Sequence, residues 1–385
     1  MALLASTSDL AEDDAVLIDG AREYARAELI PLDRKWDQDD SSVIDILDAL
    51  GEMGFLGLCV PSELDGLGCS CTTYAAITHE LSYASPSVAV TISVHSMVGR
   101  VLKRYAAEPL RSDLLREWGN PGSLAAFAIS EAGSGSDAGS AKTAAVEVDG
   151  GFRLTGEKMW ITNGLAARWL LVLARLAGGD NDGRLCAFLV DGRESGIERT
   201  PIHGKMGIRG SETAVIHFDE TFVPSTNLIG DRGDGLAVCL SALNEGRIGI
   251  AAQASGIAEA CLDEMVRYAG QRYQFGRPIG RFQAVANMIA DSATELEASK
   301  LLIRRAAHRI DNGLEARSAS AMAKLHASES ANRIAYRAVQ VHGGSGYVHE
   351  CRVEQLYRDA RVTTIYEGTS EIQRIVIGRG LKNAS

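Results

Sequence analysis

Apolar residues recur at helical spacing through the first third of the chain. After Ser41-Ser42, the run VIDILDALGEMG places its apolar residues on one helical face behind a polar cap. The same spacing covers 74–106, with a polar break at Ser85-Pro86, where proline interrupts a helix. The pattern predicts a mainly helical segment from about 8 to 120.

The middle of the chain carries short alternating runs. Val146-Glu147-Val148 and Phe152-Arg153-Leu154 alternate on either side of the turn residues Asp149-Gly150-Gly151, which is typical of a β-hairpin. Further short apolar runs lie at 169–174, 185–190 and 214–218. We interpret 123–232 as a β domain.

From Gly233 onward the sequence is long, Ala-rich and helical, and Pro278 is its only proline. Such segments pack naturally as a helical bundle. The order helices, strands, helices predicts an α+β protein rather than alternating βαβ units. We expect an α-helical domain over 1–122, a sandwich-like or barrel-like β domain over 123–232, and a four-helix bundle over 233–385.

Composition excludes several classes of function. Apolar residues make up 46% and charged residues 23%, as in ordinary globular proteins, and the net charge is −11. That charge argues against binding nucleic acid or anionic membranes, although one local basic pocket could still hold a phosphorylated ligand. The start, MALLASTSDLAEDD, is acidic and lacks a targeting pattern, and no apolar stretch could span a bilayer, so we expect a cytoplasmic protein.

The seven cysteines are scattered and odd in number, which predicts a reducing compartment and no disulfide framework. Cys69 and Cys71 form a C-x-C pair with no second Cys or His pair near in sequence. Because a structural metal site needs four ligands, we expect no metal.

Two segments could hold a cofactor. The Gly/Ser-rich run from Ala128 to Ser140 offers backbone N–H groups and hydroxyls that can cradle a polyanion, or it is an exposed connection. Its glycine spacing misses the dinucleotide fingerprint, and no βαβ unit surrounds it. In Trp160-Ile-Thr-Asn-Gly164, the indole face and the Thr162 hydroxyl suit the face and edge of a flavin ring, although a tryptophan more often packs in a core.

The last motif is Tyr366-Glu-Gly-Thr-Ser-Glu-Ile-Gln-Arg374. Ser370 with Gln373 matches a capping box, which predicts a helix beginning near Glu371. Glu367 then lies in the preceding loop, where a lone glutamate is usually a solvated carboxylate. Gly368 beside it allows close approach of the backbone to a ligand.

Taken together, these segments resemble the acyl-CoA dehydrogenase family, nearest to its short-chain and bacterial butyryl-type members. The resemblance covers essentially the whole chain. It rests on the 130–140 loop, WITNG at 160–164, KMGIRGSET at 205–213, RYQFGRPI at 272–279, QVHGGSGY at 340–347 and YEGTSEIQR at 366–374.

The resemblance implies a homotetramer with FAD held between subunits. Phe127, Ile129, Ser130, Gly135 and Ser136 would line the flavin, ribityl and phosphate region, with Trp160 and Thr162 at the ring and Thr162 near N5. The pyrophosphate and adenosine end would be held by a neighbouring subunit through Arg272, Phe275, Gln283, Gln340, Gly343 and Gly344. Thr369 and Glu371 would contact the cofactor that the first subunit binds. Arginine suits a pyrophosphate because its planar fork donates to two oxygens.

The implied activity is α,β-desaturation of a short or short-branched acyl thioester in fatty acid metabolism. Removing the weakly acidic α-proton requires a base in a dry site and hydrogen bonds to the developing enolate oxygen. Glu367 would be that base, with a pKa raised by burial, while the β-hydride passes to flavin N5. The resemblance supplies the Glu367 N–H and a ribityl hydroxyl as enolate donors, and an electron-transferring flavoprotein as oxidant. Substrate contacts would come from Ser136, Asn244, Arg247, Tyr366 and Gly368.

Some relatives carry the base on an inner helix, at the position of Gly246 here. Glu245 is one residue away, about 100° around a helix, so Glu367 is the better candidate. The chain departs from the family pattern at Asn244, where Asp is frequent, and at Ala132, Arg352 and Gln355. The Asn244 change leaves open whether coenzyme A or an acyl-carrier protein carries the acyl group.

Three other functions fit parts of this pattern. A flavin monooxygenase on the same fold would lack the glutamate of Y-E-G-T, which is present as Glu367. A non-catalytic acyl-carrier-binding homologue would not need Glu367 or the cofactor loops. A nicotinamide-dependent Rossmann enzyme would need a βαβ frame around its glycine loop.

Overall fold

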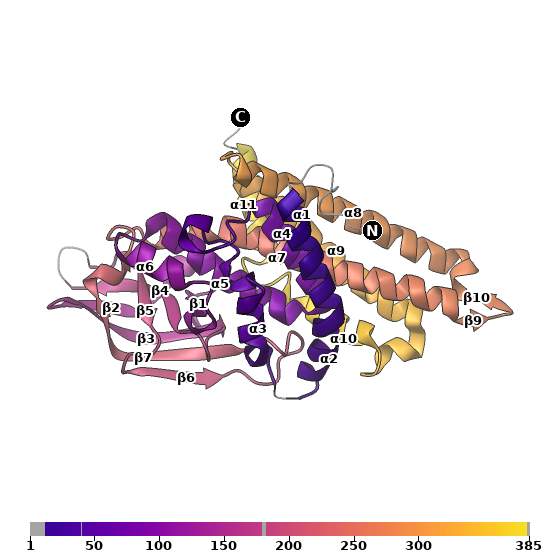
Figure 1. Ribbon diagram of the computed structural model, residues 1–385, viewed down its shortest axis with the longest axis horizontal. Coiled ribbons are helices and arrows are strands. Elements are labelled where there is room, and N and C mark those ends of the chain that lie inside the picture. Colours follow the sequence, from indigo (N-terminus) through magenta and orange to yellow (C-terminus); the bar gives the residue numbers. More distant parts are fainter. Residues whose placement is uncertain (1–11, 40, 179–181, 383–385) are drawn as a thin grey trace.

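The computed structural model describes residues 12–39, 41–178 and 182–382. Helices precede and follow a sheet along the chain, which confirms the α+β prediction, and the sheet lies at one end of the molecule (Figure 1). The N-terminal helices are α1 Glu12–Tyr24, α2 Ile30–Trp36, α3 Leu47–Glu52, α4 Cys71–Ala84, α5 Pro86–Tyr105 and α6 Leu110–Glu117. Among the described residues, no helix combines the length and apolarity needed to cross a membrane.

The predicted break at Ser85-Pro86 is confirmed, because α4 ends and α5 begins there. The Ser85 hydroxyl accepts a hydrogen bond from the Val88 N–H (3.2 Å), and Pro86 occupies the first turn, where no N–H is required. Ser42 also acts as a cap, but it caps a 3-10 turn over Val43–Ile46 that leads into α3.

The middle of the chain forms an eight-stranded sheet with the order β6-β7-β3-β2-β4-β5-β8, and β1 pairs in parallel with β4. The strands are β1 Ala125–Ala128, β2 Ala144–Val148, β3 Gly151–Thr162, β4 Trp169–Ala177, β5 Leu185–Asp191, β6 Ile197–Pro201, β7 Thr213–Pro224 and β8 Leu228–Ile229. The predicted hairpin is β2–β3, with Val148 opposite Gly151.

The C-terminal part is a bundle of long helices. These are α7 Gly235–Gln271, α8 Gln283–Asp311, α9 Arg317–His342, α10 Arg352–Val362 and α11 Ser370–Lys382. A short hairpin, β9 Tyr273–Gln274 with β10 Arg277–Pro278, joins α7 to α8. It protrudes at the end of the bundle farthest from the sheet (Figure 1).

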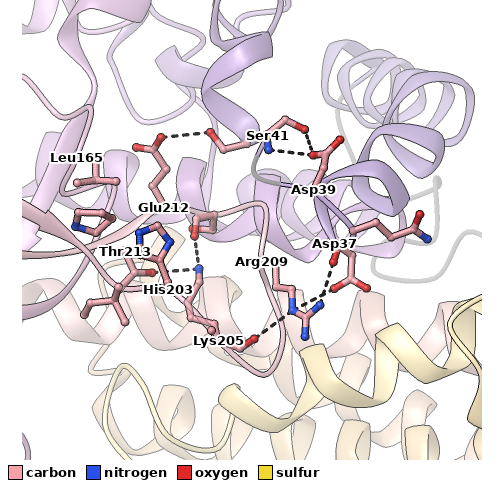
Figure 2. Close-up of a pocket in the computed structure, with 15 residues that line it drawn as sticks. Asp37, Asp39, Ser41, Leu165, His203, Lys205, Arg209, Glu212 and Thr213 are labelled. Atoms are coloured by element: carbon pink, nitrogen blue, oxygen red, sulfur yellow. Dashed lines mark hydrogen bonds and ion pairs between the residues drawn. The ribbon is translucent and has the colours of Figure 1, made fainter.

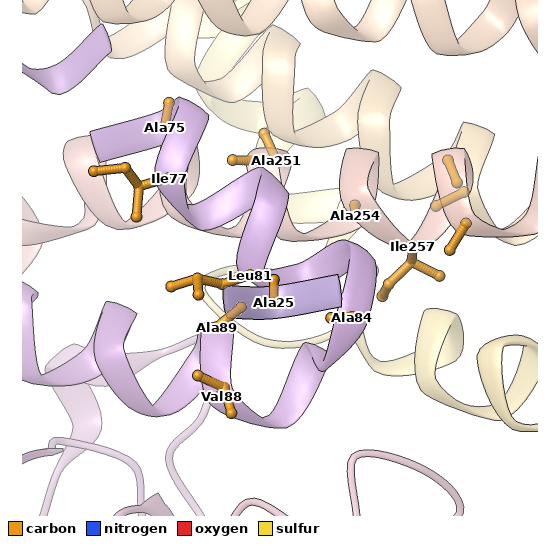
Figure 3. Packing of buried hydrophobic residues seen from close by; sticks show 14 of the residues in the cluster. Ala25, Ala75, Ile77, Leu81, Ala84, Val88, Ala89, Ala251, Ala254 and Ile257 are labelled. Atoms are coloured by element: carbon orange, nitrogen blue, oxygen red, sulfur yellow. The ribbon is translucent and has the colours of Figure 1, made fainter. Parts of the chain in front are cut away.

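The N-terminal and C-terminal helices share one hydrophobic core. Small residues of α4 and α7, such as Ala75 and Ala254, let the two helices approach closely (Figure 3). At Gly256 a β-carbon would lie 2.4 Å from the carbonyl oxygen of His79 on α4. The helix that carries Gly246 and Arg247 is therefore fixed against the N-terminal helices, while the sheet has its own core around Phe152, Phe188 and Phe218.

Two departures from the family pattern lie at the contact between α2 and α10. The Gln355 Nε2 donates to Asp33 Oδ2 (2.6 Å), and Gln355 Oε1 accepts from Arg34 (2.8 Å). Burial raises the pKa of Asp33 to about 6, although a hydrogen bond from Ser85 and the charge of Arg352 lower it. Gln355 and Arg352 thus both stabilise a buried carboxyl in this junction.

Candidate active site

The loop between α10 and α11 has a strained backbone. Glu367 (φ 53°) and Gly368 (φ 88°) are both left-handed, a conformation that costs a non-glycine residue energy and is kept where surrounding contacts impose it. Lys324 Nζ on α9 and Gln373 Nε2 on α11 each donate to the Gly368 carbonyl at 2.8 Å, and Gln373 Nε2 also reaches the Glu367 carbonyl at 3.2 Å. These contacts hold the loop from two helices.

The predicted capping box at Ser370 is wrong, although α11 begins close to the expected residue. Thr369 is the cap, since its Oγ1 accepts from the Ile372 N–H at 3.3 Å, while the buried Ser370 Oγ finds no hydrogen-bond partner in the described part of the chain. The Gln373 side chain does not bond back to the helix start because it is committed to the Glu367–Gly368 loop. Glu371 stands exposed in the first turn.

Glu367 is half-buried, and one oxygen of its carboxyl group faces the protein interior. Its Oε2 is shielded from solvent and has no hydrogen-bond partner among the described residues. Burial raises the pKa of Glu367 to about 7, although the positive charges of Arg247 and Lys324 lower it. A carboxylate with this pKa is suited to accept a proton near neutral pH.

Gly246 on α7 provides the space for that carboxyl group. A β-carbon at Gly246 would lie 2.2 Å from Glu367 Oε2 and 3.0 Å from the Met97 sulfur. The neighbouring Glu245 points elsewhere, since its Oε2 pairs with Arg100 Nε at 2.9 Å. The carboxyl group of Glu367 therefore lies against Gly246, whereas the carboxyl group of Glu245 points away from that position.

Arg247 and Asn244 lie one turn apart on α7. The Arg247 Nη1 donates to Asn244 Oδ1 at 2.9 Å, and the arginine is only 4% exposed. Burial lowers the pKa of Arg247 to about 10, although the charge of Glu367 raises it. A buried guanidinium next to Glu367 favours the ionised form of that carboxyl group.

An apolar wall joins the Glu367 loop to the sheet. Val90 and Val94 of α5 pack with Ile250 of α7, and Phe127 of β1 and Tyr366 pack against this group. The Tyr366 hydroxyl donates to Gln253 Oε1. The structure thus brings Phe127 and Tyr366, which are far apart in sequence, to one apolar surface.

Trp160 projects from an irregular point in β3. The register against β7 shifts between Lys158 and Ile161, and Trp160 has φ 65° and is 58% exposed. A bulge of this kind redirects a side chain out of the sheet. Thr162 is half-buried next to Asn163, whose buried Nδ2 donates to the Thr91 (3.1 Å) and Ala125 (2.9 Å) carbonyls. The sequence did not single out Asn163, which anchors the segment.

The Gly/Ser-rich loop lies directly beside Trp160. The Met159 N–H donates to the Ser130 carbonyl at 2.9 Å, and the buried Lys158 Nζ donates to the Ile129 carbonyl (3.3 Å) and to Glu131 Oε1 (2.8 Å). Although burial raises the pKa of Glu131, hydrogen bonds from Lys158, Lys142 and Thr143 lower it to about 2. Lys158 lies outside the sequence motifs, and Glu131 lies within the 130–140 motif but had been assigned no role.

The loop fits a flavin cofactor. Gly135 and Ser136 are exposed, and a β-carbon at Gly133 or Gly135 would meet no atom of the described residues within 4 Å. An exposed indole face next to an open loop of backbone and hydroxyl groups suits a flat ring with a phosphate tail. Phe127, Ile129, Ser130, Gly135, Ser136, Trp160 and Thr162 therefore lie along one region of the molecule.

The remaining predicted cofactor residues lie elsewhere. Arg272, Phe275 and Gln283 are exposed around the β9–β10 hairpin, and Phe275 is 92% exposed. Gln340, Gly343 and Gly344 are exposed where α9 ends, and stacking of Tyr268 on His342 (ring centroids 4.2 Å apart) holds this end against α7. Within one chain, the hairpin is therefore separated from the sheet by the length of the bundle (Figure 1).

The KMGIRGSET segment lines a separate cavity of about 340 Å³ between the β6–β7 connection and residues 37–39, 41 and 42 (Figure 2). Lys205 Nζ donates to the Ile208 carbonyl (2.8 Å) and Thr213 Oγ1 (3.2 Å), and Arg209 Nη1 donates to the Asp37 carbonyl (3.0 Å). Burial lowers the pKa of Lys205 to about 8. These side chains mainly fix the connection that carries Ile208 to the apolar wall.

Helical segments before and after a sheet, an exposed indole beside an open glycine loop, and a shielded carboxyl oxygen next to an apolar wall are features that a flavin-dependent dehydrogenase requires. Sequence profiles for the N-terminal, middle and C-terminal domains of acyl-CoA dehydrogenase match residues 11–119, 126–221 and 233–382. The chain belongs to the acyl-CoA dehydrogenase family, and it is an oxidoreductase with FAD as its cofactor.

Relatives and solved structures agree over nearly the full length. An acyl-CoA dehydrogenase of Bacillus subtilis is 40% identical over 94% of this chain and 95% of the relative. The rat mitochondrial short-chain specific acyl-CoA dehydrogenase is 39% identical over 96% and 90%. Butyryl-CoA dehydrogenase from Megasphaera elsdenii has a TM-score of 0.93 at 32% identity, covering 97% and 99% of the two chains. An acyl-CoA dehydrogenase complexed with FAD from Bacillus anthracis has a TM-score of 0.91 at 29% identity, covering 99% and 68%.

Proposed function

We propose that this enzyme desaturates short or short-branched acyl-CoA thioesters between Cα and Cβ, with Glu367 removing the α-proton. The observation that carries the proposal is the Glu367 carboxyl group itself: its Oε2 is shielded from solvent, it lies against Gly246, and its pKa is raised to about 7. FAD supplies the acceptor for the β-hydride. The Glu367 backbone N–H, held in place by the anchored loop, donates to the thioester oxygen as negative charge develops there.

The electrons leave through an electron-transferring flavoprotein. A relative that is 38% identical over 86% of this chain and 88% of its own length, from Acetobacterium woodii, is named as a subunit of a caffeyl-CoA reductase–Etf complex. We expect this acceptor to approach the side of the molecule on which Trp160 is exposed, because the flavin ring would lie against that indole.

The apolar wall limits the depth of the acyl pocket. Ile250 is fully buried against Val90 and Val94. Tyr366 packs against this cluster, and its hydroxyl donates a hydrogen bond to Gln253. We expect higher kcat/KM for C4–C6 and short-branched thioesters than for C12, and Ile250→Ala should shift the preference toward longer chains by removing one wall side chain. Steady-state kinetics with C4, isobutyryl, 2-methylbutyryl, C8 and C12 thioesters measure this.

Ile248→Ala is the matched control, because Ile248 is also fully buried on α7 but packs in the helical core. It should lower the free energy of unfolding as much as Ile250→Ala does, without changing chain preference. A wild-type enzyme that prefers C12 would contradict the short-chain proposal. Running the panel on both coenzyme A and carrier-protein thioesters decides which carrier Asn244 accommodates.

The assembly is proposed to be a homotetramer in which each β9–β10 hairpin completes the FAD site of a neighbour. An exposed Phe275 and Arg272 far from the Trp160 region of their own chain favour this arrangement. Arg272→Ala should weaken FAD retention about tenfold or more, since a charge-assisted bond to phosphate contributes roughly 1.5–3 kcal/mol. Flavin content after gel filtration, with light scattering for mass, measures the effect.

Arg267→Ala is the control that tests whether the loss of any arginine near this end of α7 is enough to weaken FAD retention. Arg267 pairs with Glu264 on the helix surface, so its loss should leave flavin content unchanged. A stable monomer that keeps one FAD per chain would contradict the shared site.

A further inference from the structure

Lys324 differs from the other fully buried lysines. Lys158 and Lys300 donate to the carboxylates of Glu131 and Glu259, at 2.8 and 2.7 Å. Lys324, on α9, donates instead to the Gly368 carbonyl at 2.8 Å. Burying an ammonium group is costly unless it is paired, so its position beneath the Glu367 loop requires an explanation.

The charges around Lys324 come from several helices. Its pKa is lowered to about 8, first by burial, while Glu367 raises it and Arg247 of α7 lowers it. Glu329 of α9 and Glu371 of α11 make smaller contributions that raise it. Glu367 is thus the acidic group with the largest effect on Lys324, and Lys324 in turn favours the ionised form of Glu367.

We propose that Lys324 is a positioning residue for the reaction, which clamps the Glu367 loop through the Gly368 carbonyl and keeps the Glu367 carboxylate ionised until it takes the α-proton. The inference rests on the proposed role of Glu367 as the base. Lys324 supplies two separable things, a hydrogen bond to the loop and a positive charge. Gln373 shares the hydrogen-bonding role but carries no charge.

The charge has an effect only over a limited pH range. The pKa of Glu367 is about 7 and that of Lys324 is about 8, so below about pH 8 the ammonium group stabilises the carboxylate. Removing the charge raises the pKa of Glu367, and the acid limb of the pH–rate profile moves to higher pH. Above pH 8 Lys324 is itself losing its proton, so the effect of removing its charge should fade.

The test compares Lys324→Gln, which keeps a donor without charge, with Lys324→Met, which keeps neither. The measurement is anaerobic reduction of the bound flavin by butyryl-CoA between pH 6 and 9.5, with FAD content and Tm determined for each holoenzyme. Lys324→Gln should be about tenfold slower than wild type at pH 6.5, as expected for a shift of about one pKa unit, and within about twofold above pH 8.5. Lys324→Met should be slower at every pH because the loop also loses its clamp.

Lys300→Met is the matched control, since it removes another fully buried lysine of the same bundle. It should lower Tm without moving the acid limb. Lys324→Gln with a wild-type acid limb, while Glu367→Gln is inactive, would overturn the inference and leave the proposed function intact. A Glu367→Gln enzyme that still reduces its flavin would overturn the proposed function itself. If Lys324→Met fails to fold, the comparison of Lys324→Gln with wild type decides.

Discussion

Glu367→Gln should leave the flavin oxidised when the enzyme is mixed with butyryl-CoA without oxygen. Glutamine keeps the size and hydrogen-bonding shape of glutamate, but it cannot accept the α-proton at neutral pH. Loss of a general base costs about 10²–10⁴-fold in rate or more. Stopped-flow absorbance of the flavin isolates this chemical step from transfer of electrons to the acceptor.

The fold should survive this change. Within residues 12–39, 41–178 and 182–382 the Glu367 Oε2 has no hydrogen-bond partner, and the contacts from Lys324 and Gln373 go to backbone carbonyl groups that the substitution retains. FAD content and Tm should therefore stay near wild type, and thioester binding should persist.

Glu245→Gln is the matched control, because Glu245 is a neighbour of Gly246 on α7 but pairs with Arg100. Its flavin should be reduced at close to the wild-type rate. If Glu245→Gln is inactive and Glu367→Gln reduces its flavin normally, the base is misassigned even though the family is right.

Features fixed by neighbouring residues were predictable from the sequence. The end of α4 follows from Ser85-Pro86, whose cap and missing N–H act within one turn. The β2–β3 hairpin follows from Asp149-Gly150, where a glycine can take the φ of 76° that the turn requires. Glu367 and Trp160 were found because each sits in a long motif.

Features that depend on distant contacts were not predictable. Lys324 and Gly368 are 44 residues apart, and a lysine in a long Ala-rich helix has no local sign of burial. The capping-box prediction failed for the same reason: the Gln373 side chain donates to the Glu367 and Gly368 carbonyls and does not bond to Ser370. The exposure of Trp160 depends on a register shift against β7, which periodicity alone does not reveal.

The sequence also named residues that one chain does not bring together. Trp160 and Thr162 lie by the sheet, whereas Arg272 and Phe275 lie at the far end of the bundle (Figure 1). Motifs identify the members of a site but carry no distances between them. A cofactor site that is shared between subunits requires its two groups of residues to lie far apart within each chain. The proposed function therefore includes the oligomer.

Gly246→Ala should displace the Glu367 carboxyl group while leaving the glutamate itself unchanged, so it tests how much the rate depends on the position of the base. A β-carbon at this position would lie 2.2 Å from Glu367 Oε2, so the carboxyl group must move. Because that oxygen is the far end of a flexible side chain, the move costs little folding free energy, and alanine itself favours a helix interior by about 0.5–1 kcal/mol over glycine. Misplacing a catalytic group by about 1 Å can cost about 10²-fold in rate.

We therefore expect Gly246→Ala to reduce its flavin about 10²-fold more slowly than wild type, with full FAD content and a Tm that is equal or higher. Gly270→Ala is the matched control on α7, because a β-carbon there would meet no atom of the part of the chain that the structure describes within 4 Å, and its rate should be unchanged. The same stopped-flow measurement serves both variants. A Gly246→Ala enzyme with wild-type kinetics would mean that Glu367 does not work from its place against α7, since the carboxylate cannot occupy that place once a methyl group is there.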